Sequence, residues 1–353
     1  MVPVLNLPAL PEALHLAAAD PCTLSRWHSE FAVNPSSLAA LPAMTHTLTV
    51  TGIPGGLGFQ KVGSVWMMVG EPLAPSWAWS HLVYTLLSLT RATGAVPCFA
   101  PVSAEFAALL STLGFLNVRL GSAPYIHLQN WPQSGNPGSG VRNARNRAVR
   151  DGIEFSHLWP GQNNRNSPEE QQNWQREVTA LSAEWLTGHR FSRPFRWIFD
   201  LRPLAFQEVK HYFEARCEGR LIGLIAASPL PGRASWYLED VLRARGASAA
   251  TGTALVAYAL DAFKTNGLHL VTLGGVPLSR ARGWAVTVIT PLERAAYRLR
   301  PLLSRLYSFD GLEMFKRRFG PAHWEDEYLA LPGGLWPRFK VAAAIARLIL
   351  FGR

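Results

Sequence analysis

A segment dense in turn-forming residues interrupts the chain at residues 133–140, where the sequence reads Gln-Ser-Gly-Asn-Pro-Gly-Ser-Gly. Glycine, proline, serine and asparagine favour turns, and such a run cannot contribute to a packed core. A chain of 353 residues is also long enough for two domains. We therefore predict one domain at residues 1–135, a second domain at residues 136–334 and a terminal helix at residues 335–353.

The first half alternates between strand and helix patterns. Two β-favouring runs flank the turn Pro54-Gly55-Gly56, and each of the helical patterns that come next is followed by another strand pattern. This alternation favours a mixed α/β domain. The strand patterns lie at residues 47–51, 65–69, 95–100 and 115–120, and the helical patterns at residues 77–93 and 104–113.

The second half opens with helical patterns at residues 141–152 and 169–185, and continues as strand, hairpin, strand, helix, strand. That order is typical of the GNAT acyltransferase fold, and the first half can be interpreted as a degenerate copy of it. We therefore predict an α/β (α+β) protein with tandem GNAT-like acyltransferase folds and mixed sheets. The strands are expected at residues 211–217, 221–227, 235–242 and 268–273, and the helix at residues 249–266.

The charge of the chain favours polyanionic partners. Lysine and arginine number 34 against 24 aspartate and glutamate residues, for a formal net charge of +10. Four arginines, Arg142, Arg145, Arg147 and Arg150, lie on the expected helix at residues 141–152, where only Asp151 balances them. This helix suits an RNA backbone or anionic lipid headgroups, although a solvated helix face and a charge that serves solubility would have the same composition.

Neither a metal site nor a membrane span is expected. The three cysteines lie far apart and the histidines are scattered, so the sequence indicates no disulfide framework and no zinc site, and a reducing cytoplasm fits. Residues 1–16 lack the basic region of a signal peptide. The apolar stretch at residues 341–351 is shorter than the roughly 20 residues that a span requires. We expect the terminal helix to dock on the domain, with Trp336 and Phe339 able to lie at a membrane surface.

Several segments, in order along the chain, resemble the catalytic domain of phosphatidylglycerol lysyltransferases. Two of them have low specificity, namely Val69-Gly70-Glu71-Pro72 and the arginine-rich residues 141–148. The more specific ones are Glu239-Asp240-Val241-Leu242-Arg243, Thr251-Gly252-Thr253, Leu273-Gly274-Gly275-Val276-Pro277-Leu278, and Leu306-Tyr307-Ser308-Phe309-Asp310-Gly311-Leu312 followed by Phe315-Lys316-Arg317-Arg318-Phe319 and Trp324.

The resemblance implies two GNAT-like units with a substrate cleft between them. It further implies transfer of an amino acid from aminoacyl-tRNA to a membrane phospholipid such as phosphatidylglycerol, without a metal or an organic cofactor. The catalytic residues that it indicates are Asp240, Arg243 and Lys316, and the substrate-binding residues are Gly274, Gly275, Tyr307, Arg142 and Arg145.

The residue types agree with the needs of this reaction. A lipid hydroxyl attacks an aminoacyl ester, so the site needs a group that receives or orients a proton and cations that hold phosphate and oxyanion. Asp240 is interpreted as the orienting acid, the general base or the anchor of the substrate α-ammonium, Arg243 as a phosphate clamp, and Lys316 as a positive charge. Residues three apart on a straight strand point to opposite faces, so we predict a bulge between Asp240 and Arg243.

The resemblance has limits that leave alternatives open. Family members commonly carry a many-helix membrane domain ahead of this region, and this sequence shows none. We therefore expect a cytoplasmic protein at the inner face of the membrane, with a separate membrane protein as a candidate partner that recruits it. Ser122 and Ala123 stand where acidic residues are usual, and Glu71 where aspartate is usual, which leaves the amino acid and the acceptor undetermined.

Two other functions remain open on the sequence alone. The first is a GNAT enzyme that uses acyl-CoA, because residues 245–252 lie between a strand and a helix, where such enzymes bind a pyrophosphate. The second is a non-catalytic relative that binds tRNA or lipid. In simpler interpretations, Asp240 and Arg243 form a surface ion pair, and Lys316 lies on a solvated helix face.

Overall fold

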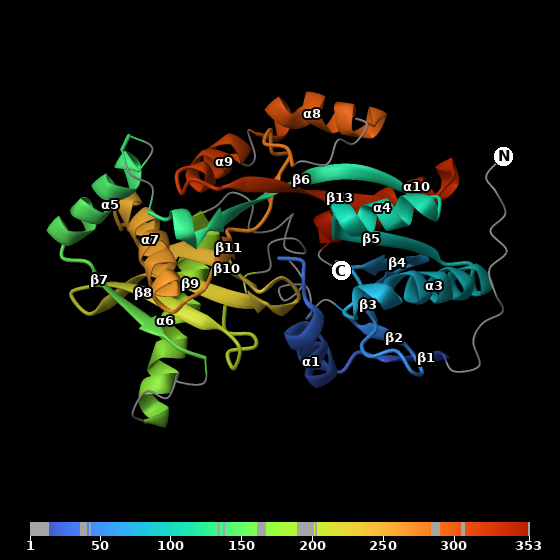
Figure 1. Ribbon diagram of the computed structural model, residues 1–353, viewed down its shortest axis with the longest axis horizontal. Coiled ribbons are helices and arrows are strands. Elements are labelled where there is room, and N and C mark those ends of the chain that lie inside the picture. The colour runs from blue at the N-terminus through green and yellow to red at the C-terminus, as the bar shows by residue number, and fades with distance from the viewer. Residues whose placement is uncertain are drawn as a thin grey trace.

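The structure is a computed structural model that describes residues 14–35, 41, 44–132, 135–136, 138–160, 167–188, 201, 203–283, 290–304 and 308–351. Its strands form one continuous thirteen-stranded sheet with helices packed against it (Figure 1). The order along the sheet is β1-β2-β3-β4-β5-β13-β6-β11-β10-β9-β8-β7, and the short β12 pairs with β6. The predicted mixed α/β class is therefore confirmed.

In the first half of the chain, the described residues form six strands and three α-helices. They are β1 (Leu14–Ala18), α1 (Pro21–Phe31), β2 (His46–Val50), β3 (Leu57–Val62), β4 (Val65–Met68), α3 (Trp79–Thr93), β5 (Val96–Ser103), α4 (Ala104–Thr112) and β6 (Leu116–His127), with the short 3-10 helix η2 (Ser76–Ala78) before α3 and η3 (Leu128–Asn130) after β6.

The second half supplies the remaining elements. They are α5 (Ser139–Arg150), β7 (Glu154–Leu158), α6 (Pro168–Gly188), β8 (His211–Cys217), β9 (Arg220–Leu230), the 3-10 helix η4 (Pro231–Arg233), β10 (Ser235–Arg243), α7 (Ala249–Thr265), β11 (Leu270–Thr272), β12 (Val276–Pro277), α8 (Pro291–Leu303), α9 (Phe309–Arg317), β13 (His323–Leu331) and α10 (Leu335–Phe351).

The two halves repeat one order of elements. In the first half, β3 and β4 are antiparallel, and α3 then leads to β5, which runs parallel to β4. In the second half, β9 and β10 are antiparallel, and α7 leads to β11, which runs parallel to β10. Each half thus contains an antiparallel strand pair, a helix and a parallel strand, as expected for two GNAT-like units in tandem.

The last strand of each half lies beside strands of the other half. β13 comes from the second half and pairs with β5 and β6, whereas β6 comes from the first half and pairs with β13 and β11. Figure 1 shows β6 and β13 side by side, bridging the two lobes. The sheet is thus continuous across the boundary placed near residue 135, and the division into residues 1–135 and 136–334 stays a prediction.

Helices cover both faces of the first half. Successive strand residues point to opposite faces, so Trp66 packs in the core beneath α3 and α4, and Met67 packs beneath α10. Val341 of α10 is fully buried there, which confirms that the terminal helix docks on the sheet. Within the part of the chain that the structure describes, none of the helices combines the length and apolar character needed to cross a bilayer.

The second half is built in the same way. α5 and α7 cover one face of its strands, and α6 covers the other. α7 begins where the Ser248 hydroxyl accepts a hydrogen bond from the Ala250 amide, and it ends one residue before Asn266. α5 ends before Gly152, whose φ of +64° is the left-handed conformation that glycine adopts at helix ends. The helix therefore lies where its sequence pattern predicts.

Candidate active site

The parallel strands β10 and β11 separate soon after they meet. They pair only at Trp236 with Val271 and at Tyr237 with Thr272, although β10 continues to Arg243 against β9. Among the strands that the structure describes, none pairs with residues 238–243 on the β11 side. The edge of β10 at residues 238–243 therefore lies outside the ladders of the described strands.

Lys316 lies beside the chain that leaves β11. Its Nζ donates hydrogen bonds to the carbonyl oxygens of Gly274, at 2.8 Å, and Gly275, at 2.9 Å. Burial lowers the pKa of Lys316 to about 7, against the opposing effect of the Glu327 carboxylate. The structure thus brings together three of the residues predicted from the sequence, and Lys316 is buried rather than part of a solvated helix face.

Both glycines lie against the side chain of a neighbouring residue. Gly274 has a φ of +74°, and a Cβ on it would lie 2.4 Å from a ring carbon of Tyr237. A Cβ on Gly275 would lie 2.2 Å from Oε2 of Glu327. A larger residue at either position would displace its neighbour, so the backbone approach to Tyr237 and Glu327 depends on glycine.

Glu327 and Glu71 are two acids in this region that the sequence analysis did not select. Glu327 is half-buried, its Oε1 has no hydrogen-bond partner among the described residues, and burial raises its pKa to about 7. Glu71 follows β4 and is buried, and its carboxylate accepts a hydrogen bond of 2.5 Å from the Ser103 amide. Burial raises the pKa of Glu71 as well. The run Glu325-Asp326-Glu327 in an otherwise apolar strand was the available signal.

A third acid, Glu325, forms an ion pair with Arg233. Arg233 of η4 contacts both carboxylate oxygens of Glu325, at 2.5 and 2.7 Å, and donates to the Tyr125 hydroxyl at 2.7 Å. Burial alone would raise the pKa of Glu325, but the hydrogen bonds and charge of Arg233 hold it below its usual value. This acid is therefore ionised and occupied at neutral pH.

The opposite face of β13 carries a fully buried ion pair. Arg119 Nε lies 2.6 Å from Asp326 Oδ1, and the two side chains are 0% and 1% exposed. The Arg119 guanidinium also donates to the carbonyl oxygens of Ser279, at 2.8 Å, and Ala281, and to the Tyr297 hydroxyl. Arg119 therefore fastens the segment after β12 and helix α8 to β6.

The predicted bulge between Asp240 and Arg243 is wrong. Pairing with β9 is regular from Asp240 to Arg243, and the register shifts one residue earlier, between Leu238 and Asp240. Glu239 at this shift forms a buried ion pair of 2.7 Å with Lys210. Glu239 could not be selected from the sequence, because the position of a bulge depends on the partner strand.

The remaining predicted residues near β10 and α9 occupy several places. Arg243 donates a hydrogen bond to the Ala247 carbonyl, at the end of β10. The Asp240 side chain and the whole of Tyr307 lie outside the described residues. Whether Asp240 and Arg243 serve one site therefore stays a prediction.

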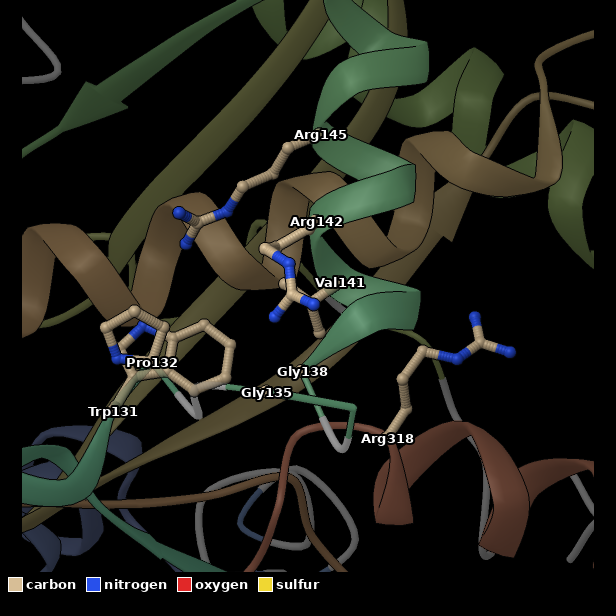
Figure 2. Close-up of a pocket in the computed structure, with 8 residues that line it drawn as sticks. All are labelled: Trp131, Pro132, Gly135, Gly138, Val141, Arg142, Arg145 and Arg318. Carbon is tan, nitrogen blue, oxygen red and sulfur yellow. The ribbon is translucent and has the colours of Figure 1, made fainter.

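Arg142 and Arg145 line a separate pocket with a volume of 360 Å³. Figure 2 shows both side chains extending from α5 toward Trp131 and Pro132, while Arg318 extends from the end of α9. Arg145 pairs with Asp261 at 2.6 Å. The lining holds three guanidinium groups and no acid, so the pocket suits an anion. The eight lining residues are Trp131, Pro132, Gly135, Gly138, Val141, Arg142, Arg145 and Arg318.

The described residues contain no group of three or more histidine, cysteine, aspartate or glutamate side chains placed to hold a metal ion. The residues around Gly274 and Gly275, namely Glu71, Glu327, Lys316 and Tyr237, carry carboxyl, amine and hydroxyl groups.

Comparison with solved structures identifies the same fold in three proteins. The C-terminal DUF2156 domain of an Agrobacterium fabrum protein assigned as a lysylphosphatidylglycerol synthetase aligns with a TM-score of 0.74 and 18% identity, over 94% of this chain and 97% of that one. L-PGS from Bacillus licheniformis aligns with a TM-score of 0.73 and 23% identity, over 94% and 96%. FemX aligns with a TM-score of 0.52 and 10% identity, over 94% and 100%.

Sequence comparison extends this likeness to a family. A phosphatidylglycerol lysyltransferase of Bacillus subtilis (strain 168) is 24% identical over 274 residues, which are 77% of this chain and 30% of that protein. The chain thus spans about 30% of the length of this curated relative. The family model described as phosphatidylglycerol lysyltransferase, C-terminal, matches residues 36–331. The chain therefore belongs to the family of phosphatidylglycerol lysyltransferase C-terminal domains.

Proposed function

We propose that this chain is an aminoacyltransferase that moves an amino acid from aminoacyl-tRNA to the hydroxyl of a membrane phospholipid such as phosphatidylglycerol. The observation that carries the proposal is the burial of Lys316 against Gly274 and Gly275 where β10 and β11 separate, in a chain that matches the family over residues 36–331. The relative's name specifies lysine. The amino acid used by this chain is left to experiment.

The reaction exchanges one ester for another. The lipid oxygen bonds to the carbonyl carbon of the aminoacyl group, the bond from that carbon to the ribose oxygen breaks, and the hydroxyl proton ends on the ribose oxygen. Negative charge develops on the carbonyl oxygen in the transition state, and a buried cation such as Lys316 stabilises it strongly because the surroundings have a low dielectric constant.

The donor is proposed to bind through its phosphates at the arginine-lined pocket. Arg318 lies two residues after Lys316, so this pocket adjoins the helix that carries the buried lysine. Arg318 also donates a hydrogen bond of 2.8 Å to Thr253 near the start of α7. Guanidinium groups bind phosphates in two-point fashion, and each phosphate contact makes RNA binding weaken with salt.

The acceptor membrane is proposed to lie against the start of α10. Leu335, Trp336 and Phe339 are 85%, 67% and 64% exposed, although α10 buries its other side against the sheet. Lys340 lies beside this apolar patch, 6.0 Å from the Trp336 ring. Aromatic side chains with adjacent cations favour the headgroup region of an anionic bilayer. We propose a peripheral location at the cytoplasmic face on this basis.

Asp240 and Arg243 keep proposed roles along β10, where regular pairing puts residues three apart on opposite faces, so each is proposed to bind a different part of the donor. Asp240 would anchor the α-ammonium of the amino acid, and Arg243 would hold a phosphate once it exchanges its hydrogen bond to Ala247 for the ligand. No metal or organic cofactor takes part in this proposal, and aminoacyl-tRNA is the co-substrate.

The test is a reconstitution with the purified chain. The protein is incubated with a pool of charged tRNAs and vesicles containing phosphatidylglycerol, and the lipids are identified by mass spectrometry. We expect an aminoacylated lipid whose formation is abolished by prior ribonuclease treatment. Lys316→Met should lower the rate by at least about 10-fold, whereas Lys61→Met, which removes an exposed lysine of β3, serves as the matched control.

Two results would contradict the proposal. Formation of the product without tRNA would show that aminoacyl-tRNA is not the donor. The absence of an aminoacylated lipid with every charged tRNA would show that the chain does not catalyse the proposed reaction. Acetyl-CoA binding measured by calorimetry in the second case would favour the acyl-CoA alternative.

A further inference from the structure

Glu327 occupies an irregular position at the centre of the sheet. It pairs with Gly121 of β6, but its neighbour Tyr328 pairs with Arg119, so the register shifts directly after Glu327. On its other side Glu327 pairs with Ser103 of β5. A bulge in a strand re-aims the side chain next to it, and such positions are common at active sites.

The two carboxylate oxygens of Glu327 have different surroundings. A Cβ added to Gly275 would lie only 2.2 Å from Oε2, so this oxygen packs against Gly275. The carbonyl of the same glycine accepts a hydrogen bond from Lys316. Oε1 is shielded and has no hydrogen-bond partner among the described residues. Native structures pair the large majority of buried polar atoms, so a shielded carboxylate oxygen without a partner requires an explanation, and a contact with a ligand would supply one.

Four charged groups influence the ionisation of Glu327, and one of them, Arg119, acts from the opposite face of the sheet. Lys316 of α9 and Arg119 of β6 favour its ionised form, whereas Glu71 after β4 and Glu325 on the same strand oppose it. Burial is the largest influence and raises the pKa of Glu327 to about 7. A carboxyl group with a pKa near the working pH is suited to accept and return a proton within one reaction cycle.

The other two acids of the cluster are less suited to this task. Glu325 is held by the two terminal nitrogens of the Arg233 guanidinium, so its oxygens are occupied. Glu71 is only 5% exposed and accepts the Ser103 amide, so a substrate hydroxyl has no access to it. Oε2 of Glu71 and Oε1 of Glu327 are both shielded and have no hydrogen-bond partner among the described residues, but of the two residues only Glu327 is partly exposed.

We propose that Glu327 is a further catalytic residue, the general base that accepts the proton of the attacking lipid hydroxyl. This inference rests on the proposed function. As the lipid oxygen bonds to the carbonyl carbon, its proton moves to Oε1 of Glu327. When the ester bond to the ribose breaks, the same proton passes to the ribose oxygen, so Glu327 ends the cycle ionised and no further reactant is needed. In this scheme, Asp240 keeps its proposed role as the anchor of the amino acid's α-ammonium group.

The test compares rate profiles over about pH 5.5–8.5 at saturating donor and acceptor for the wild-type chain, Glu327→Gln and Lys316→Met. The wild-type profile is expected to rise as Glu327 ionises and to fall as Lys316 loses its charge. Glu327→Gln should lower the maximal rate by about 10²- to 10⁴-fold and remove the rising limb. Lys316→Met should remove the falling limb instead. Glu170→Gln, at an exposed position of α6, is the control.

The outcomes separate the two proposals. Glutamine has the shape of a protonated glutamate, so a purely structural role predicts that Glu327→Gln keeps the wild-type rate and the rising limb. That result, with an active wild-type enzyme, overturns the role of Glu327 and leaves the proposed function intact. A wild-type chain that forms no aminoacylated lipid at any pH overturns the function and this inference together.

Discussion

The buried pair between Arg119 and Asp326 gives the sharpest prediction on stability. Arg119→Leu leaves the Asp326 carboxylate without its counter-charge in a site where both side chains are at most 1% exposed. It also takes a hydrogen-bond donor from the carbonyls of Ser279 and Ala281. Breaking one member of a buried pair costs about 3–5 kcal/mol. We expect the free energy of unfolding to fall by about that amount.

Unfolding in urea, followed by tryptophan fluorescence, measures this loss. The double variant Arg119→Leu/Asp326→Leu removes both charges, and apolar pairs replace buried ion pairs at little cost, so it should recover at least about 2 kcal/mol relative to the single variant. Arg147→Leu is the control, because Arg147 and Asp151 form an exposed pair on α5 worth about 0.3–0.5 kcal/mol.

The reasoning would be refuted by either of two results. One is a loss below about 1 kcal/mol for Arg119→Leu, within the range of exposed pairs. The other is a double variant as unstable as the sum of the two single variants, because it would show no coupling between Arg119 and Asp326.

Three further predictions concern the site, acid sensitivity and RNA binding. Gly275→Ala should abolish lipid aminoacylation, since its Cβ would press on the Glu327 carboxylate, whereas Gly246→Ala, with nothing within 4 Å of its Cβ, should retain it; equal rates would contradict this. Burial lowers the pKa of His157 to about 4 and that of His211 to about 3. As the pH falls below about 6.5, these histidines take up protons in the unfolded chain before they do so in the folded chain, so the folded state loses stability. The urea concentration at the unfolding midpoint should therefore be lower at pH 5 than at pH 7, and the difference should be smaller in His211→Phe. Arg142→Ala should weaken tRNA binding and reduce the slope of log affinity against log salt by about 1, and an unchanged slope would exclude a phosphate contact.

Local elements could be predicted because their signals are local. The strand expected at residues 235–242 is Ser235–Arg243, and the helix expected at residues 249–266 is Ala249–Thr265. Hydrophobic periodicity, a hairpin turn and a helix-terminal glycine are all contained within a few residues. The pairing of β13 between β5 and β6 could not be predicted in this way, because the sequence of one strand does not identify a partner that lies far away in the chain.

The site was predictable only in part for the same reason. Lys316 and the pair Gly274 and Gly275 are about 40 residues apart in the chain, and the resemblance, not their spacing, grouped them. The bulge at Glu239 and the role of Glu327 depend on strand register, and a shift of one residue reverses the face on which each side chain lies. Such shifts cannot be located from one strand's sequence.

The crossed placement of β6 and β13 limits how substrates can enter. β13 is hydrogen-bonded to β5 and β6, and β6 is in turn hydrogen-bonded to β11. The two lobes are therefore connected by several strand ladders and not by a hinge. Swinging the lobes apart would break those ladders, in contrast with enzymes that close two domains around a ligand. We therefore expect reactants to reach Glu327 and Lys316 through movements of loops and flanking helices, and not through separation of the lobes.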